Sequence, residues 1–381
     1  MTRLLITTSV PTTLVTFLLP YARHFRSRGF TVHALSNGAS DCAACRDAFD
    51  EVFDVPWTRR PRDPVNLTEA PRRLRALVRE QRYDLVHTHD PIAAFVTRLA
   101  LRRARRTGRP RVVYTAHGFH FHGEGGRLSN LVFRTAERLA GRWTDYLIVI
   151  NRDDEQAALE HRIVPPQRLR YMPGIGVDLG IYAADRVTPS QVRGLRAEIG
   201  VPEDAQLLTM VAEFNPGKRH RDALRALAAA RRRDVHLVLL GVGPLMDEVR
   251  AEADALGLRG RVHLLGFRSD VPAWLSASFA TILPSEREGL PRCIMESFCL
   301  ARPVISTRIR GVRELVDDDT GMLTAVGDTA AMAAAIDALA ADPERSARMG
   351  RVGRERMGAF DLQRVLRLHE ALYAEALADP A

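Results

Sequence analysis

Two glutamates, Glu288 and Glu296, stand on either side of a Gly-Leu-Pro insert, with seven residues between them. The apolar run Phe279–Leu283 predicts a buried strand just before them, and Pro291 is typical of the first turn of a helix. Unpaired N–H groups at such a helix start, with the positive end of its dipole, attract an anion. Carboxylates on either side can accept hydrogen bonds from hydroxyl groups. The segment therefore predicts a site for a phosphate flanked by sugar hydroxyls, as in a sugar nucleotide.

A single lysine, Lys218, stands in a chain that has 54 arginines. Where a chain uses arginine for nearly every cation, one retained lysine indicates a place that requires a compact ammonium rather than a planar guanidinium. We interpret Lys218 as a second part of the anion site.

A histidine, His117, follows the apolar run Val112–Thr115 on a glycine-containing turn, where a parallel sheet places functional groups. We expect His117 to be functional and the nearby His120 and His122 to be structural. Together with residues 87–90, His-Thr-His-Asp, these histidines suggest zinc, but neither segment has the spacing of a closed zinc site. No Asp-x-Asp pair ends a strand, so we expect no metal and no cofactor, and both segments to line one wall of a cleft.

Composition indicates a globular, two-domain protein. The 381 residues, 46% hydrophobic and 27% charged, are enough for two full cores. No apolar run approaches the roughly 18 residues that cross a bilayer, and threonines and a proline interrupt the apolar start, residues 4–19. The four cysteines are too few and too clustered for a disulfide framework, and Cys42 and Cys45 lack a second pair for zinc. We expect a cytoplasmic protein.

Positive charge is concentrated in the first half of the chain. Residues 1–173 hold 28 basic and 17 acidic residues, a net charge of +11, whereas the whole chain carries +9. The arginines are not interleaved with aromatic residues and no nucleic-acid-binding motif is present, so we expect no nucleic acid. The positive charge of the first half favours an anionic membrane surface or a diphosphate-bearing lipid as its partner. It also favours a location peripheral to the inner face of the plasma membrane.

Strand-like and helix-like segments alternate along the chain, which predicts an α/β fold of two Rossmann-like, doubly wound parallel-sheet domains facing across a cleft. The glycine-rich run Pro173–Pro189 reads as a hinge. We expect an N-terminal domain over residues 1–172 and a C-terminal domain over 173–361. The last helix, 362–381, is expected to cross back to the first domain.

Six segments, in the right order over nearly the whole chain, resemble family-4 retaining glycosyltransferases of the GT-B fold, in particular bacterial exopolysaccharide-type members. The two most specific are TAHGFHFH, which ends at residue 122, and the Glu-x7-Glu stretch PSEREGLPRCIMES at 284–297. The others are YMPGIGVDLGIY at 171–182, VAEFNPGKRH at 211–220, GVGPLMDEV at 241–249 and LLGFRSDVPAWL at 264–275.

The resemblance implies transfer, with retention, of a hexosyl or N-acetylhexosaminyl group from a UDP-sugar to a hydroxyl acceptor, either a lipid-linked saccharide or a small metabolite. It implies that the N-terminal domain binds the acceptor and the C-terminal domain binds the nucleotide sugar. It implies a metal-independent, front-face mechanism in which His117, Glu288 and Lys218 are catalytic. It also implies which residues bind the donor. Lys218 and Arg219 would contact the diphosphate, and Glu296 would contact the ribose. Phe267 and Arg268 would contact the base, and the donor sugar would be held by Glu288, Gly289 and Leu290.

One position departs from the family pattern. Many relatives carry an arginine about five residues before the lysine, where this chain has Glu213. The diphosphate would then depend more on Arg219, Arg287 or the helix start. Two alternatives stay open: a non-hydrolysing UDP-sugar 2-epimerase, and a catalytically silent subunit that binds the donor and assists a partner.

Overall fold

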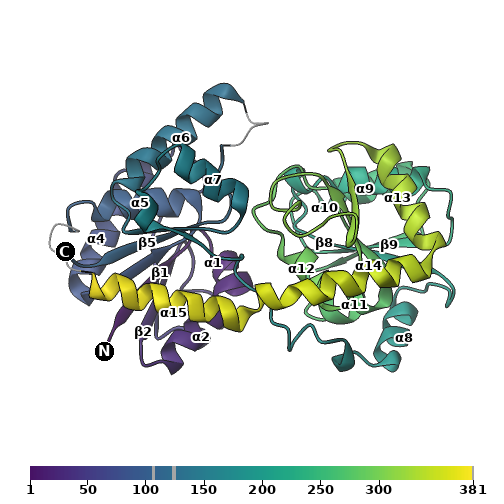
Figure 1. Ribbon diagram of the computed structural model, residues 1–381, viewed down its shortest axis with the longest axis horizontal. Helices are drawn as coiled ribbons and strands as arrows, with labels where there is room; N and C mark the ends of the chain where they lie inside the picture. Colours follow the sequence, from purple (N-terminus) through teal and green to yellow (C-terminus); the bar gives the residue numbers. More distant parts are fainter. Residues whose placement is uncertain (105–107, 122–125, 380–381) are drawn as a thin grey trace. The chain divides into compact units, whose positions relative to one another are not determined.

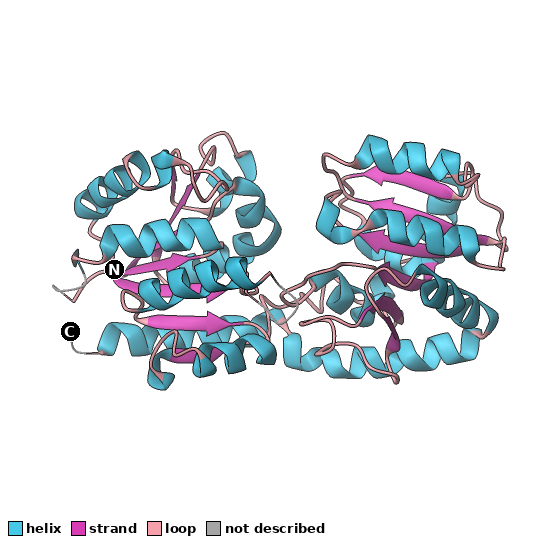
Figure 2. Cartoon of the chain, turned by 90° about the horizontal axis from the view of Figure 1, so that it is seen from above, coloured by secondary structure: helices cyan, strands magenta, loops and turns pink. Residues whose placement is uncertain are grey.

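The computed structural model describes residues 1–104, 108–121 and 126–379. The chain forms two compact units, one of residues 1–175 with 365–381 and one of residues 176–364. Each unit holds one sheet of parallel strands with helices on both faces (Figure 2). The prediction of two doubly wound, Rossmann-like parallel-sheet domains is confirmed. Within the described residues, no helix combines the length and the apolar character needed to pass through a bilayer.

The first unit contains a seven-stranded sheet in the order β3-β2-β1-β4-β5-β6-β7 (Figure 1). Its strands are β1 (Arg3–Thr7), β2 (Thr31–Ser36), β3 (Glu51–Asp54), β4 (Leu85–Thr88), β5 (Arg111–Ala116), β6 (Tyr146–Val149) and β7 (Leu169–Tyr171). Its helices are α1 (Pro11–Thr13), the π-helix η1 (Leu14–Leu18), α2 (Leu19–Ser27), α3 (Ala43–Ala48), η2 (Pro64–Asn66), α4 (Glu69–Gln81), α5 (Pro91–Leu101), α6 (Arg127–Gly141), α7 (Arg152–Glu160) and η4 (Pro166–Arg168).

The second unit contains a six-stranded sheet in the order β10-β9-β8-β11-β12-β13. Its strands are β8 (Gln206–Val211), β9 (Val235–Leu240), β10 (Val262–Gly266), β11 (Ser278–Leu283), β12 (Val304–Thr307) and β13 (Gly321–Thr324). Its helices are η5 (Ala184–Arg186), α8 (Pro189–Glu198), η6 (Pro216–Lys218), α9 (His220–Ala229), α10 (Met246–Ala255), α11 (Val271–Ala277), α12 (Arg292–Cys299), α13 (Thr329–Ala341), α14 (Pro343–Arg356) and η7 (Met357–Phe360).

The strand sequences explain why these sheets are buried. The strand β9, VHLVLL, is almost continuously apolar, and the central strand β4, LVHT, is buried throughout although it carries His87 and Thr88, as expected where helices cover both faces. In the first unit, one cluster packs α4 and α5 against the sheet around the fully buried Trp57. These cores hold the strand ends, and thus the loops that follow them, in fixed positions.

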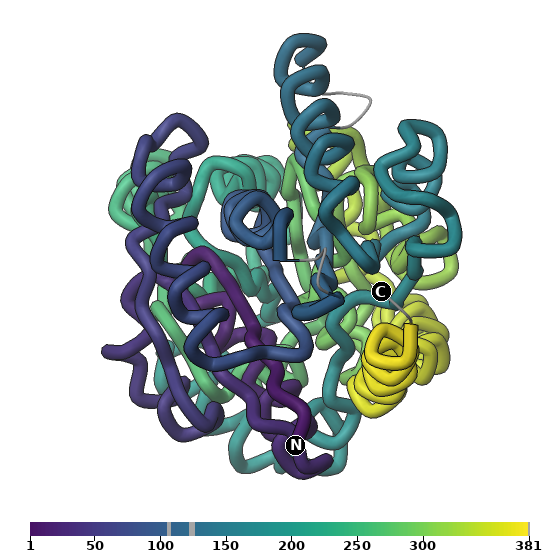
Figure 3. The backbone as a smooth tube through the Cα atoms, turned by 90° about the vertical axis from the view of Figure 1, so that its left-hand side faces the viewer, coloured from purple at the N-terminus to yellow at the C-terminus, as the bar shows by residue number. Residues whose placement is uncertain are grey.

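The last helix, α15 (Leu362–Ala378), begins in the second unit and continues into the first. Its Tyr373 ring lies 4.8 Å from the Phe25 ring on α2, and its Glu370 carboxylate lies 2.8 Å from the His24 ring on the same helix. The end view in Figure 3 shows the carboxyl-terminal part of this helix in yellow. Residues 365–379 therefore complete the first unit although they come last in the chain.

Three helices differ from what the sequence pattern predicts. The pattern predicts one helix over residues 65–82, which the structure divides into η2 and α4, and one over residues 12–28, which contains the π-turn η1. Pro20 lacks the N–H that an α-helix would use in that turn, which accounts for the wider turn before it. The pattern also predicts a helix over residues 92–106; helix α5 ends at Leu101, and residues 105 and 106 lie outside the described residues.

Candidate active site

In each sheet the strand order reverses at one point. Strands that come earlier in the unit are added on one side of this point, and strands that come later are added on the other side. In the second unit it lies between β8 and β11, which are hydrogen-bonded neighbours. Ligands of doubly wound sheets bind beyond the carboxyl ends of the strands at such a point. The two loops that emerge there are joined at the backbone, because the Glu286 N–H donates to the Gly217 carbonyl at 3.0 Å.

The side chains of Lys218 and Glu288 meet between these loops. The Lys218 Nζ lies 2.5 Å from the Glu288 Oε1, and the two side chains are only 25% and 10% exposed. The turn that carries Lys218 is held by Asn215, whose side-chain oxygen accepts from the Lys218 N–H at 3.2 Å. The lone lysine and the loop glutamate, 70 residues apart in sequence, are thus one charged pair.

The pair lies at the start of α12. Burial alone would lower the pKa of Lys218, but the Glu288 carboxylate and the nearby Cys293 thiol raise it above its ordinary value. Cys293 is the second residue of α12, so the ammonium lies near the first turn of that helix. The charged lysine and the positive end of the α12 dipole attract the same kind of ligand, an anion.

Close packing fixes the loop from Glu288 to Leu290. Gly311 has a φ of +75°, and a Cβ there would lie 2.0 Å from the Gly289 carbonyl oxygen. The Leu290 side chain is buried, and the Thr307 hydroxyl donates to the Ser285 carbonyl oxygen. Any residue larger than glycine at 311 would displace the Gly289 and Leu290 backbone.

Glu296 lies within α12, as predicted, and is 6% exposed. The Tyr182 hydroxyl donates to its Oε1 at 2.7 Å, and the Arg292 Nε lies 2.8 Å from the same oxygen. Burial raises the pKa of Glu296, while Arg292 and Tyr182 oppose the rise. These two partners hold the carboxylate in place. The sequence analysis named neither: Tyr182 lies 114 residues away, whereas the i,i+4 spacing of Arg292 and Glu296 on one helix is a signal that could have found Arg292.

Two arginines beside the lysine differ in their availability. The Arg219 Nε lies 2.6 Å from Asp222 Oδ2, and its Nη1 lies 3.7 Å from Glu286 Oε2. Arg287 is exposed and forms no ion pair with any residue that the structure describes. Of these two arginines, Arg287 therefore has the more available charge.

Phe267 and Arg268 follow β10 at the edge of the second sheet. The Arg268 guanidinium lies 2.7 Å from Glu198 and 2.6 Å from Asp270, which leaves little of its charge for a ligand. The Phe267 ring, in contrast, is 77% exposed. An exposed aromatic face beside free backbone groups suits a planar base.

The corresponding turning point of the first unit lies between β1 and β4. Asp90, the second residue after β4, has a φ of +61°, an uncommon conformation that often marks functional sites. Its Oδ2 accepts from the Ser9 N–H at 2.9 Å, which ties the two loops together.

His117 meets His89 at this edge, because β4 and β5 are hydrogen-bonded neighbours and both residues lie just past the ends of these strands. The His89 Nδ1 lies 2.9 Å from the His117 Nε2, while the His89 Nε2 is buried without a partner among the described residues. A buried N–H without an acceptor is rarer than a bare acceptor. We therefore assign the proton to His89 Nδ1, which leaves His117 with its own proton on Nδ1.

Burial keeps these histidines neutral. It lowers the pKa of His117, which Asp90 partly offsets, and it lowers the pKa values of His87 and His89 well below their ordinary value. The His87 ring lies between the Tyr373 hydroxyl, 2.5 Å from Nδ1, and the Thr115 hydroxyl, 2.7 Å from Nε2. Nothing in the local sequence indicates Tyr373, which α15 brings from 286 residues away.

His120 lies against the Phe133 ring of α6, with ring centroids 5.1 Å apart. His122 lies outside the described residues. Across the parts of the chain that the structure describes, no group of three or more His, Cys, Asp and Glu side chains is arranged to hold a metal ion.

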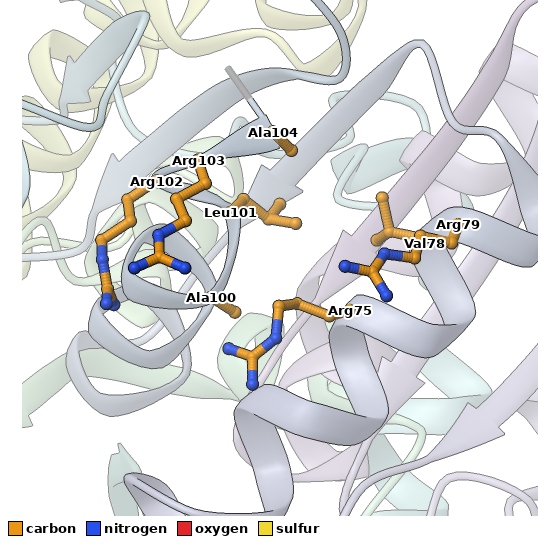
Figure 4. Close-up of a pocket in the computed structure, with 8 residues that line it drawn as sticks. All are labelled: Arg75, Val78, Arg79, Ala100, Leu101, Arg102, Arg103 and Ala104. Atoms are coloured by element: carbon orange, nitrogen blue, oxygen red, sulfur yellow. The ribbon is translucent and has the colours of Figure 1, made fainter. Parts of the chain in front are cut away.

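A pocket of about 480 Å³ lies elsewhere in the first unit, between α4 and α5 (Figure 4). Its lining includes Arg75 and Arg79 of α4 and Arg102 and Arg103 just past α5. Crossover helices run back from the carboxyl ends of the strands, so the end of α5 lies at the opposite edge of the sheet from His117. This pocket is separate from the candidate site.

Comparison with known proteins gives the family. The description "Glycosyltransferase Family 4" matches residues 14–179, and "Glycosyl transferases group 1" matches residues 192–356. The putative glycosyltransferase EpsD of Bacillus subtilis is 34% identical over 367 residues, which cover 95% of this chain and 92% of EpsD. The chain belongs to the family-4 glycosyltransferases.

Further relatives within this glycosyltransferase family differ in donor and acceptor. An Escherichia coli UDP-Gal:α-D-GlcNAc-diphosphoundecaprenol α-1,3-galactosyltransferase is 31% identical over 66% of this chain and 65% of its own. The solved structure of Anabaena HepE in complex with UDP aligns with a TM-score of 0.80 at 21% identity, covering 98% of this chain and all of HepE. The predicted GT-B fold and family are thus confirmed.

Proposed function

We propose that this glycosyltransferase moves a hexosyl or N-acetylhexosaminyl group from a UDP-sugar to a hydroxyl group of a lipid-linked saccharide or a small metabolite, with retention. The Lys218–Glu288 pair at the start of α12 carries this proposal, because it provides a cation for the diphosphate beside a carboxylate for sugar hydroxyls. The relatives support the donor and acceptor classes, since one is named for UDP-galactose and a diphosphoundecaprenol-linked sugar.

In the proposed front-face step, the bond between the sugar C1 and the diphosphate oxygen breaks while a bond from C1 to the acceptor oxygen forms on the same face. The leaving phosphate oxygen takes the proton of the acceptor hydroxyl. Negative charge grows on the diphosphate in this step, and donors already aimed at it lower the barrier. Lys218, Arg287 and the N–H groups at the start of α12 would supply these donors.

The ligand must first separate Lys218 from Glu288. A diphosphate would attract the ammonium, and the released carboxylate would accept hydrogen bonds from the donor sugar, with the Gly289 and Leu290 backbone beside it. Glu296 would hold the ribose, and the exposed Phe267 with the backbone of Arg268 would contact the base. Arg219 would keep the Lys218 loop in place. His117 would donate from Nδ1 to the transferring sugar.

We propose that no metal or cofactor takes part, because Lys218, Arg287 and the start of α12 already balance the negative charge of the diphosphate. A cytoplasmic location fits the four free cysteines. We also propose that the basic first unit contacts the anionic inner face of the plasma membrane peripherally.

The test is to incubate purified protein with UDP-glucose, UDP-galactose and UDP-N-acetylglucosamine, and separately with GDP-mannose, together with lipid-linked and soluble acceptors. We expect UDP release that requires an acceptor, and an anomeric proton coupling in the product that shows the configuration of the donor. Inverted product would refute retention, and transfer from GDP-mannose alone would refute the UDP donor. Epimerised UDP-sugar without acceptor would favour the 2-epimerase, and transfer only with a partner protein would favour the silent subunit.

A further inference from the structure

Helix α6 in the first unit leaves apolar side chains uncovered. Leu128, Leu131, Val132 and Leu139 are 75%, 50%, 58% and 41% exposed. The described residues include fourteen exposed large hydrophobic side chains, and four of them lie on this one 15-residue helix. Leu128, Val132 and Leu139 have the spacing of a single helix face, with Leu131 beside them. They form an apolar stripe on the outer side of α6.

The inward side of α6 is a different surface. Glu137, Ala140 and Gly141 are buried there, and the Glu137 Oε2 accepts from Arg98 at 2.9 Å. Figures 1 and 3 show the amino-terminal turns of α6 standing clear of the neighbouring helices of the first unit. The apolar stripe is therefore exposed in this unit rather than being part of its core.

A row of arginines runs beside the stripe. Arg127, Arg134 and Arg138 are spaced by seven and four residues, which places them on one helix face beside the stripe, and none of them forms an ion pair with a described residue. Glu137 is the only acidic residue of α6, and it is turned inward against Arg98. The outward side of α6 is therefore apolar and positive, with no carboxylate.

Basic groups continue along the same layer of helices. The Arg102 guanidinium lies 6.0 Å from the centre of the Trp143 ring, two residues past the end of α6. Arg102 and Arg103 also line the pocket with Arg75 and Arg79 (Figure 4). An apolar stripe bordered by unpaired arginines is the pattern of a helix that lies in the interface of an anionic membrane.

We propose that α6 docks the first unit onto an anionic lipid surface, with the apolar stripe entering the headgroup boundary and Arg127, Arg134 and Arg138 contacting lipid phosphates. A second copy of the chain fits less well, because a symmetric contact through α6 would set the two arginine rows against each other. At 15 residues the helix is too short to cross the bilayer and would lie along its surface.

This inference deepens the proposed membrane contact and adds a consequence for the acceptor. Helix α6 belongs to the β5–β6 crossover that begins with the His117 loop. Docking through α6 would therefore bring the candidate acceptor-binding edge close to the membrane, where a lipid-borne acceptor is found.

The test is flotation of the full chain with vesicles of phosphatidylcholine alone, or of phosphatidylcholine mixed with phosphatidylglycerol. We expect binding to the mixed vesicles only, weakened by salt. The triple variant Leu128→Ser, Leu131→Ser, Val132→Ser should bind at least about tenfold more weakly, since three apolar side chains no longer enter the interface. Replacing Arg127 and Arg138 with glutamine should weaken binding to mixed vesicles and remove most of its dependence on salt.

A matched control replaces three exposed leucines outside α6, Leu67, Leu159 and Leu256, with serine, and should bind as the natural chain does. Unchanged binding of the α6 variant, equal binding to both vesicle types, or a chain that binds neither would overturn the proposal. Self-association that only the α6 variant abolishes, without vesicle binding, would assign the surface to a second copy instead. Transfer to a soluble acceptor should persist in the α6 variant, so failure of docking and failure of the proposed transfer are distinguishable.

Discussion

Lys218→Ala should separate catalysis from folding at the candidate active site. The change removes the cation that lies 2.5 Å from Glu288. If Lys218 binds the diphosphate, losing this preorganised donor should lower kcat/KM by about 10² to 10³, which corresponds to about 3–4 kcal/mol. The change also leaves a carboxylate that is 10% exposed without its partner. Because Lys218 itself is a quarter exposed, we expect a stability loss of about 1–3 kcal/mol, below that of a fully buried pair.

Two further variants separate these effects. Lys218→Ala with Glu288→Ala removes both charges, so it should recover most of the lost stability while activity stays low. Lys218→Arg keeps the charge but replaces a compact ammonium with a planar group, and we expect it to lose activity as well.

The assay combines the initial rate of UDP release with thermal unfolding of each variant. Arg225→Ala is the control: it removes an exposed cation whose Nη2 lies 3.0 Å from Glu252, on the outer side of the same unit. It should change kcat/KM by less than about twofold and stability by less than about 1 kcal/mol. A folded Lys218→Ala protein with kcat/KM close to that of the natural chain would refute the assignment of the diphosphate site.

Three other predictions concern the histidines of the first unit and the proposed metal independence of transfer. His89→Ala should lower kcat/KM by about tenfold, because it removes the hydrogen bond to His117. In the natural chain, 15N NMR of His117 should show the ring proton on Nδ1. A proton on Nε2 would contradict the assigned tautomer. The pKa values of His87, His89 and His117 are lowered in the fold, so the stability they contribute is present above about pH 6.5 and is lost as pH falls below it. In chemical unfolding, the free energy of unfolding at pH 5 should be lower than at neutral pH by about 2 kcal/mol for each fully buried histidine. A free energy of unfolding that does not change with pH would show that these histidines are not held neutral. Transfer should proceed at the same rate after EDTA treatment, and a rate restored only by added Mg²⁺ or Mn²⁺ would refute metal independence.

The fold was predictable because its strongest signals are local. Central strands such as β9 are buried on both faces, so their sequences are continuous apolar runs between helices. The strands β3, β7 and β13 escaped prediction, and all three lie at sheet edges. They are only three or four residues long, and β3 (EVFD) and β7 (LRY) carry charged residues, because an edge strand packs against fewer neighbours. Such short edge strands therefore leave a weak pattern in the sequence.

In the candidate site, too, some residues could be predicted from the sequence and others could not. The sequence pointed to Lys218, Glu288, Glu296 and His117, because a lone lysine, a glutamate spacing that resembles the family signature and a histidine at a strand end are visible without coordinates. The partners of these residues were not visible. Tyr182 reaches Glu296 from 114 residues away, and His89 meets His117 only because β4 and β5 are neighbours in the sheet.

By itself, the sequence determined which segments form strands and helices and which side chains have the chemistry for a diphosphate and a sugar, since both depend on residue type and short-range spacing. Only the tertiary structure decided which of these groups touch. It paired Lys218 with Glu288, left Arg287 without an ion partner among the described residues while Asp222 engaged Arg219, and turned the leucines of α6 outward. Strand order and helix packing set those contacts, and both depend on residues that are distant along the chain.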